Sequence, residues 1–331
     1  MCRRLVLGPL VFVLAAASNA RAAQPTSDLE HATPASAPGS VTAPPPEPTA
    51  VPVSGRSDVV AWQPSWKRFQ PAEYALTGAL VAGTAAFIVF DEDPAPSWTG
   101  PILFEKGVRN ALRLSSPEGR RNAQTLGDAF YYGGLAYPFV VDVLAVALIA
   151  HQKPDVAAQM TLINAEAFAI TGFLSFLSNA TIRRERPYVR ECGPGKPDQV
   201  FPDCERPGHA EGFFSGHTAI AYTGAALTCS HHANLPLYGK SRVGGTITCV
   251  AMLAGATVGG VARLYADKHY AADVIVGAGI GLASGFLVPW FHYRGGGTEA
   301  PPSTPRGSGV SVLPVPLLSL AGGGVGVVGI F

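Results

Sequence analysis

The chain has 331 residues, of which 14% are charged, and its formal net charge is +1. So small a charge, without any block of like charges, creates no field that would attract nucleic acid, and we expect no nucleic-acid partner. Apolar residues are unevenly distributed. Residues 1–61 are rich in Ala, Pro, Ser and Thr, whereas long apolar stretches alternate with short polar ones from Pro71 to His292. We expect this second region to carry the fold and the function.

The amino terminus has the pattern of a secretory signal peptide. Arginines precede an apolar stretch over residues 5–17, and Ala-Arg-Ala at residues 20–22 has the small-x-small form of a signal peptidase site. We therefore predict a signal peptide over residues 1–22; an uncleaved signal anchor would show the same pattern. Residues 23–65 contain several proline clusters and few large apolar residues, which predicts a disordered tether.

Apolar segments of membrane-spanning length, or nearly so, fill the next part of the chain. They cover residues 72–90, 126–150, 155–179, 214–232, 243–263 and 270–292. Their many small residues would let helices approach closely in lipid. We therefore predict an all-α fold, a six-helix transmembrane bundle over residues 70–292, in a bacterial-type cell membrane. Polar residues such as Glu166 and His217 would also suit a soluble helical core, but residues 274–291 are almost wholly apolar and long enough to cross.

Two further segments flank or interrupt this pattern. Residues 98–124 mix apolar and basic side chains, which predicts a helix at the membrane interface. The tail over residues 293–331 begins as a Gly/Pro/Ser linker and ends in alternating Val, Leu and Gly, a composition that permits a short hairpin. Neither the role of the tail nor the oligomeric state follows from the sequence.

The cysteines divide into two pairs after the amino-terminal one. Cys192 and Cys204 share one polar loop and could form a disulfide in an oxidising compartment. Cys229 and Cys249 lie in apolar segments, and we expect them to be buried free cysteines. No Cys/His cluster indicates a metal site, so none is predicted.

The first of three polar motifs is NATIRRERP at residues 179–187, at the end of the third apolar segment. On a continuous helix, Asn179, Arg183 and Arg186 would share a face and point at one site. Guanidinium groups suit phosphate because they donate two parallel hydrogen bonds. Arginines at the end of a membrane span are also common for reasons of topology, so the motif alone does not indicate a site.

The second motif is Phe214-Ser215-Gly216-His217, at the start of the fourth segment. Ser215 can cap a helix, and Gly216 lets the backbone approach a ligand at a helix terminus that favours anions. His217 would then stand beside a bound phosphate and could give a proton to a departing alkoxide. By itself, the motif is equally typical of an ordinary helix cap.

The third motif, ARLYADKHYAAD at residues 262–273, is the most specific. His269 and Asp273 are one helical turn apart, so the carboxylate could hold the imidazole in one tautomer and leave its other nitrogen free to attack. Arg263 would arrive from the preceding helix end as a clamp for phosphate charge. An isolated His/Asp pair is more often a structural hydrogen bond.

The three motifs, in this order and at these separations, resemble the signature of the type 2 phosphatidic acid phosphatase and haloperoxidase superfamily, over roughly residues 70–292. The resemblance implies that His269 is a nucleophile that forms a phosphohistidine, that Asp273 orients it and that His217 is the general acid. It requires no metal and no other cofactor. The residues that would bind phosphate are Arg186, Arg263, Ser215 and Gly216, joined by Arg183 and Asn179.

The chain departs from the family signature at three positions. Asn179 stands where the family has lysine, Phe214 replaces a proline and Ala262 replaces a serine. The first change removes a cation from the phosphate site, which could cost a few kcal/mol of transition-state stabilisation. We expect Arg183, on the predicted helix face of residue 179, to replace that charge.

These observations predict a phosphatase that hydrolyses a lipid phosphate or diphosphate, because a site at the ends of membrane helices can receive an ester whose tail stays in the bilayer. The alternatives are a vanadium-dependent haloperoxidase, a soluble exported acid phosphatase, and a non-catalytic membrane protein that kept the fold but lost the chemistry. A cleaved signal would place the loop of residues 186–215 in the cytoplasm, whereas relatives without a signal usually place it outside. The pair Cys192 and Cys204 favours the oxidising side, and we expect a periplasmic site.

Overall fold

The computed structural model describes residues 59–90, 95–195, 202–205, 208–294, 311–319 and 322–330. The predicted signal peptide, residues 1–22, and most of the predicted tether, residues 23–65, lie outside these ranges. Val60 and Trp62 belong to the predicted tether but are buried, and the indole of Trp62 lies 5.4 Å from the ring of Tyr293. The packed part of the chain therefore begins earlier than the sequence predicts.

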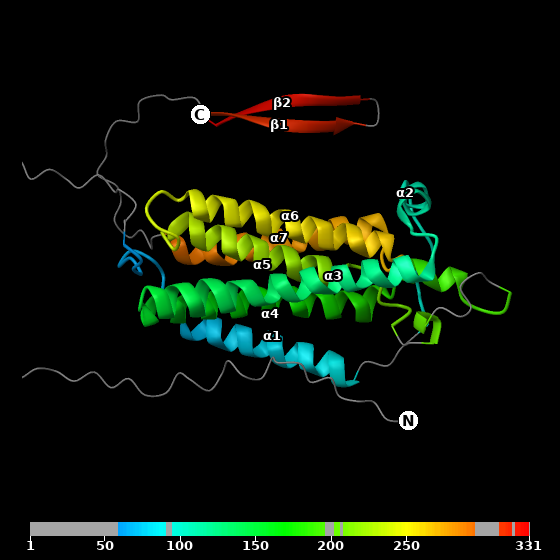
Figure 1. Cartoon of the computed structure of the whole chain (residues 1–331), viewed down its shortest axis with the longest axis horizontal. Coiled ribbons are helices and arrows are strands. Elements are labelled where there is room, and N and C mark those ends of the chain that lie inside the picture. Colours follow the sequence, from blue (N-terminus) through cyan, green and yellow to red (C-terminus); the bar gives the residue numbers. More distant parts are fainter. Residues whose placement is uncertain are drawn as a thin grey trace, which may run out of the picture. The chain divides into compact units, whose positions relative to one another are not determined.

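Six long helices, the short helix α2 and two 3-10 turns lie within the described residues from 59 to 294 (Figure 1). The long ones are α1 (Pro71–Phe90), α3 (Pro117–Tyr137) with its π-helical continuation η1 (Pro138–Ala150), α4 (Pro154–Ile182), α5 (Gly216–Asn234), α6 (Val243–Tyr265) and α7 (Ala271–Tyr293). The short ones are α2 (Glu105–Leu112) and the 3-10 turns η2 (Pro187–Glu191) and η3 (Pro202–Glu205). The predicted six-helix bundle is confirmed, and α2 lies inside the range predicted for an interfacial helix.

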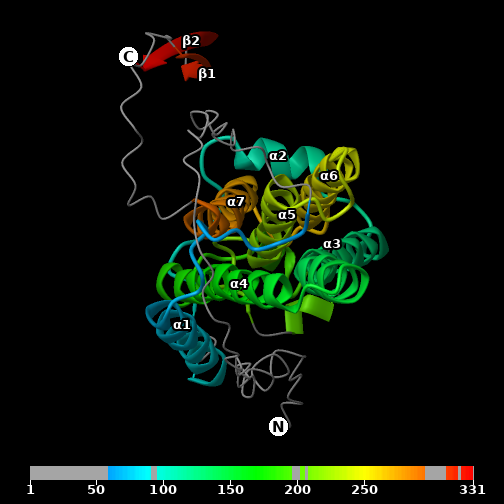
Figure 2. The same cartoon turned by 90° about the vertical axis from the view of Figure 1, so that its left-hand side faces the viewer.

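Five of these helices, α1, α3 with η1, α4, α6 and α7, are long and apolar enough to cross a membrane, and the chain is a multi-pass membrane protein. Helix α5 differs because it lies between α3, α4, α6 and α7 (Figure 2), and most of its residues are buried. Its polar residues, such as Thr223 and His231, therefore face other helices and not lipid, which lowers the cost of placing them at this depth.

Helices α5 and α7 approach closely because α7 carries a glycine at every fourth position. A Cβ atom added at Gly277 would lie 2.6 Å from the carbonyl oxygen of Ser215, and one at Gly285 would lie 2.5 Å from that of Thr223. At Gly281 the added atom would meet the carbonyl oxygen of Ala219. Small residues of this kind let helix backbones pack tightly in a membrane. The contact matters for function because α5 and α7 each begin within a sequence motif.

Replacing Gly281 by leucine is therefore expected to separate α5 from α7 and to destabilise the protein by about 1–3 kcal/mol or more, because backbone atoms cannot rotate away. Gly279→Leu is the matched control, since nothing lies within 4 Å of a Cβ atom there. Thermal unfolding of the two variants in detergent measures the difference. Equal midpoints for both would contradict the packing described for α7.

Cys229 and Cys249, predicted as free cysteines, are joined in a disulfide with their Cα atoms 4.6 Å apart. Helices α5 and α6 are consecutive and antiparallel, so residues on either side of the connecting loop lie side by side. The sequence places both cysteines in apolar segments but does not give the rotation of each helix about its axis. The pairing depends on that rotation, so the sequence alone does not predict the disulfide.

The carboxy-terminal tail contains a hairpin of two antiparallel strands, β1 (Ser311–Ser319) and β2 (Gly322–Ile330). The register pairs Ser311 with Ile330 and Ser319 with Gly322. The alternation of Val and Leu with Gly permits such a hairpin, as expected from composition. The predicted linker that precedes it, over residues 295–310, lies outside the described residues.

Candidate active site

The three sequence motifs meet at one end of the bundle, where α4 and α6 end and α5 and α7 begin (Figure 1). Backbone hydrogen bonds join them: Ser215 N donates to Asp273 O at 3.0 Å, and Gly212 N donates to Arg184 O at 2.7 Å. The second motif is thus held between the first and the third. Short helix α2 lies at the same end and supplies further side chains to this region.

His269 occupies the turn between α6 and α7, and it is 4% exposed. Its Nδ1 atom lies 2.8 Å from the carbonyl oxygen of Gly212. Because a carbonyl only accepts, we assign the ring proton to Nδ1, and Nε2 then carries a free lone pair. Asp273, the predicted orienting partner, lies 3.9 Å from the same Nδ1 atom, beyond a hydrogen bond. The Gly212 carbonyl therefore fixes the imidazole, which sequence reasoning did not find.

The surroundings of His269 favour its neutral form. Burial lowers the pKa of the imidazole well below its ordinary value, and the positive charges of Arg186 and Arg263 lower it further. The hydrogen bond to Gly212 acts in the opposite direction but is outweighed. The ring is thus a neutral base in the vicinity of two guanidinium groups, a combination that suits attack on an anion.

Asp273 acts on the backbone of the His269 turn. Its Oδ2 accepts from Tyr270 N at 2.7 Å, and this bond forms part of the capping box of α7. Its Oδ1 accepts from Arg184 Nη1 at 2.5 Å. The carboxylate therefore anchors the start of α7 directly after the histidine, and it holds the position of His269 through the chain.

Arg184, which sequence reasoning did not select, is fully buried at the centre of this region. Its guanidinium pairs with Asp273 and, through Nη2, with Glu105 Oε2 at 2.5 Å. It also stacks between Trp98 and Tyr270, with ring centroids 4.0 and 4.5 Å from Cζ. Glu105 begins α2, so this arginine ties α2 to the end of α4 and to the start of α7.

Arg183 does not join the site, in contrast to the prediction. Helix α4 ends at Ile182, and Arg183 has a left-handed backbone with φ of 47°, so the helical spacing that relates it to Asn179 is lost. Its side chain is exposed, and Nε donates to Ala180 O at 3.1 Å. Asn179 remains on the helix, and its buried Oδ1 has no hydrogen-bond partner among the described residues.

Arg186 and Arg263 both lie close enough to His217 and His269 for their positive charges to act on the two imidazoles. The Nη2 atom of Arg186 lies 3.0 Å from Glu211 Oε2. Arg263 Nη1 and His217 Nε2 each contact the carboxylate of Asp128, at 3.0 and 3.1 Å. Asp128 lies on α3, outside all three motifs, and no sequence pattern marks it as a site residue.

Ser215 and Gly216 shape the start of α5. The Ser215 side chain is fully buried, and its Oγ accepts from Thr218 N at 3.4 Å, the capping role predicted for it. A Cβ atom at Gly216 would lie 2.6 Å from Ser175 Oγ. Glycine is therefore required there for packing against α4. The contact of Gly216 with a ligand stays a prediction.

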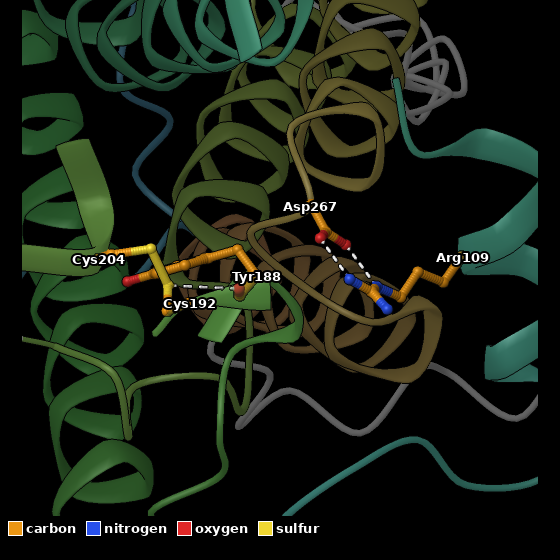
Figure 3. The surroundings of a disulfide bond; sticks show 5 residues. All are labelled: Arg109, Tyr188, Cys192, Cys204 and Asp267. Atoms are coloured by element: carbon orange, nitrogen blue, oxygen red, sulfur yellow. Dashed lines mark hydrogen bonds and ion pairs between the residues drawn. A yellow bond between two sulfur atoms is a disulfide. The ribbon is translucent and has the colours of Figure 1, made fainter. Parts of the chain in front are cut away.

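The outer side of the His269 turn is held by α2 and by a disulfide-closed loop (Figure 3). Arg109 donates from Nε and Nη2 to the two carboxylate oxygens of Asp267, both at 2.7 Å. Burial alone would lower the pKa of Arg109, but Asp267 and Glu191 raise it above its ordinary value. Cys192 and Cys204 form a disulfide with Cα atoms 5.6 Å apart. The ion pair with Arg109 thus holds Asp267, two residues before His269, in place.

The site end of the bundle also contains a buried lysine. Lys268, directly before His269, is 4% exposed, and its ammonium lies 4.7 Å from the ring centroid of Tyr188. It is a buried cation that the sequence motifs do not indicate.

In the described part of the chain, no group of three or more His, Cys, Asp or Glu side chains is placed to hold a metal ion.

Comparison with known proteins finds one family model that matches part of this chain. Residues 161–296 match the model of the PAP2 superfamily, and this range contains all three motifs. A solved structure described as the first transmembrane PAP2 type phosphatidylglycerolphosphate phosphatase from Bacillus subtilis is 18% identical, over 66% of this chain and 94% of that chain, with a TM-score of 0.42. No curated protein matches the chain. The predicted resemblance to the type 2 phosphatidic acid phosphatase superfamily is confirmed for residues 161–296.

Proposed function

We propose that the protein is a membrane phosphatase that hydrolyses a lipid phosphate or diphosphate through a phosphohistidine at His269. One observation carries the proposal: the neutral imidazole of His269, fixed by the Gly212 carbonyl, shares one end of a membrane bundle with Arg186, Arg263 and His217. A base with a free lone pair beside two guanidinium groups suits attack on a phosphorus atom. The match to the PAP2 superfamily supports the same chemistry.

The proposed reaction has two steps. In the first, His269 Nε2 attacks phosphorus, the bond from phosphorus to the lipid oxygen breaks, and His217 gives its proton to the departing oxygen. In the second, water attacks the phosphohistidine, His217 takes a proton from that water, and the bond from phosphorus to nitrogen breaks to release inorganic phosphate. Arg186 and Arg263 would stabilise the charge on the transferring group.

A lipid substrate is supported by the apolar surface beside the site. Ile102, Leu103 and Phe104 precede α2 and are 39%, 90% and 54% exposed. In a membrane protein, such residues next to a polar site suit the boundary between headgroups and acyl chains. We therefore propose that the phosphate of a lipid enters from this boundary while its tail remains in the bilayer.

The loops at the two ends of the bundle bear on the proposed orientation of the site. Lys67 N donates to His292 O at 3.0 Å, and Arg68 pairs with Asp155 at 2.6 Å, so the segment before α1 lies at the end of the bundle opposite to the site. Cleavage of a signal peptide would leave the segment before α1 in the periplasm, and the site, at the opposite end of the bundle, would then face the cytoplasm. A cleaved signal peptide is therefore incompatible with a periplasmic site. The disulfide of Cys192 with Cys204, at the site end, favours the oxidising side. We propose a periplasmic site.

Phosphate release by the detergent-purified protein from a panel of lipid phosphates and diphosphates tests the proposed activity. We expect release from at least one member, with no requirement for added metal. Oxidation of bromide by peroxide after addition of vanadate, without phosphate release, would instead indicate a haloperoxidase. A folded protein that binds vanadate but releases no phosphate from any member would indicate a site that has lost its chemistry.

The pH dependence of kcat/KM tests the state assigned to His269. Attack requires a neutral imidazole, and a lowered pKa keeps the ring neutral as the pH falls, so the acid limb due to this group should lie below pH 6.5, the ordinary histidine value. The profile should be recorded with two substrates whose phosphates ionise differently, because a limb common to both belongs to the enzyme. A common acid limb centred at or above pH 6.5 would contradict the assignment.

A further inference from the structure

Asp128 contacts Arg263 and His217, the two side chains that the proposed reaction needs for binding phosphate and for protonating the leaving group. Its Oδ1 atom lies 3.0 Å from Arg263 Nη1 and 3.1 Å from His217 Nε2. Arg263 is the proposed phosphate clamp, and His217 is the proposed general acid. The side chains of Asp128 and His217 are each 35% exposed, so the pair has room to separate.

Helix α3 is built to bring this carboxylate to the site. A Cβ atom at Gly127 would lie 2.9 Å from Arg263 Cδ, so the glycine allows the arginine to lie against α3. One turn after Asp128, the ring of Tyr131 lies 4.6 Å from the imidazole of His217, centroid to centroid. Neighbouring positions of α3 therefore contact both partners of Asp128, and the ion pairs belong to a packed arrangement.

A carboxylate and a phosphate compete for the same donors. The Nε2 atom of His217 carries at most one proton, which cannot be given to Asp128 and to a departing oxygen at once. A guanidinium group binds either anion with the same geometry. A phosphate between Arg263 and His217 would also face the negative charge of Asp128 at short range, which opposes binding.

We propose that Asp128 is a carboxylate latch, which neutralises the site when it is empty and must leave Arg263 and His217 when phosphate binds. The inference rests on the proposed function, because it takes phosphate as the ligand. The latch lowers affinity for any phosphate whose only contacts are polar. Inorganic phosphate is such a ligand, whereas a lipid phosphate gains further binding energy from its tail. Asp128 thus limits inhibition by the inorganic phosphate that the reaction releases, while the tail keeps a lipid phosphate bound.

The test is the dissociation constant of inorganic phosphate, measured by titration calorimetry on the full chain in detergent, so that turnover is not needed. Removal of the charge in Asp128→Asn is expected to tighten binding about ten- to a hundredfold, from the repulsion of two charges a few ångströms apart. Asp128→Ala should also bind phosphate more tightly, and it cannot form the hydrogen bond that the new amide of Asp128→Asn could donate to phosphate. Asp155→Asn, which breaks an exposed ion pair at the other end of the bundle, is the matched control and should bind as the parent does.

Tighter phosphate binding is informative because a variant that merely damages the fold would bind more weakly. Affinity that is unchanged or lower in Asp128→Asn and Asp128→Ala, with binding by the parent intact, overturns the latch and leaves the proposed function standing. Absence of phosphate binding in the parent together with tight binding in either variant supports the latch strongly. Absence of binding in all three overturns the latch, whereas the proposed function is decided separately by phosphate release from the lipid panel.

Discussion

Replacement of His269 by alanine is expected to abolish phosphate release, with a loss of about four orders of magnitude or more in kcat, because no other group can form the covalent intermediate. The fold should survive. Within the described part of the chain the side chain makes one hydrogen bond, to Gly212 O, whose loss costs about 1 kcal/mol. Phosphate release and thermal unfolding, measured on the same detergent-purified samples, separate the two effects.

His151→Ala is the matched control for this experiment. His151 lies at the end of the bundle opposite to the site and also makes a hydrogen bond to a backbone carbonyl, from Nε2 to Leu237 O at 2.8 Å. Its replacement should cost similar stability and leave activity unchanged. Substantial phosphate release by His269→Ala would show that the nucleophile lies elsewhere. Equal loss of activity in both variants would attribute the effect to stability.

Replacement of Arg184 by methionine is expected to destabilise the protein by about 3–5 kcal/mol, because it leaves the carboxylates of Glu105 and Asp273 buried without the guanidinium that neutralises them. Activity should fall as well, since Asp273 caps α7 immediately after His269. Chemical unfolding in detergent measures the first effect, and phosphate release measures the second.

The neighbouring arginine supplies a sharp control. The Arg183 side chain is exposed and donates to Ala180 O at its own helix end, so Arg183→Ala should change stability by less than about 0.5 kcal/mol and should keep its activity. Adding Glu105→Gln to Arg184→Met should recover part of the lost stability, because it removes one of the two uncompensated charges. Equal stability of the two arginine variants would contradict the burial described for Arg184.

Much of the fold is predictable because lipid constrains it. A segment that crosses a membrane must be apolar over about 20 residues, so the sequence locates α1, α3 with η1, α4, α6 and α7 to within a few residues, apart from an earlier start of α3. Helix α5 is found despite its polar residues because the Ser-Gly-His motif marks its beginning. The positions of His269, His217, Arg186 and Arg263 follow from the motifs, since each stands at the end of a long helix or in the turn beside it.

The remaining parts of the site depend on details that periodicity does not contain. Helix α4 ends at Ile182 and does not continue to Arg186, so Arg183 is exposed and Arg184 is buried. The bond to the Gly212 carbonyl involves the backbone, where the residue type gives no signal. Asp128 lies in an ordinary stretch of α3, and only the packing of α3 against α6 brings it to Arg263.

The most direct test of the account is detection of phosphate bound covalently to His269. The parent enzyme should be mixed with a lipid phosphate that it hydrolyses, quenched with alkali within one turnover, digested and examined by mass spectrometry, beside His269→Ala. We predict an acid-labile, alkali-stable phosphate on the peptide that contains His269, formed and lost at rates that match turnover, and absent from the variant. Phosphate release by the parent with no label at His269 at any time would contradict the account.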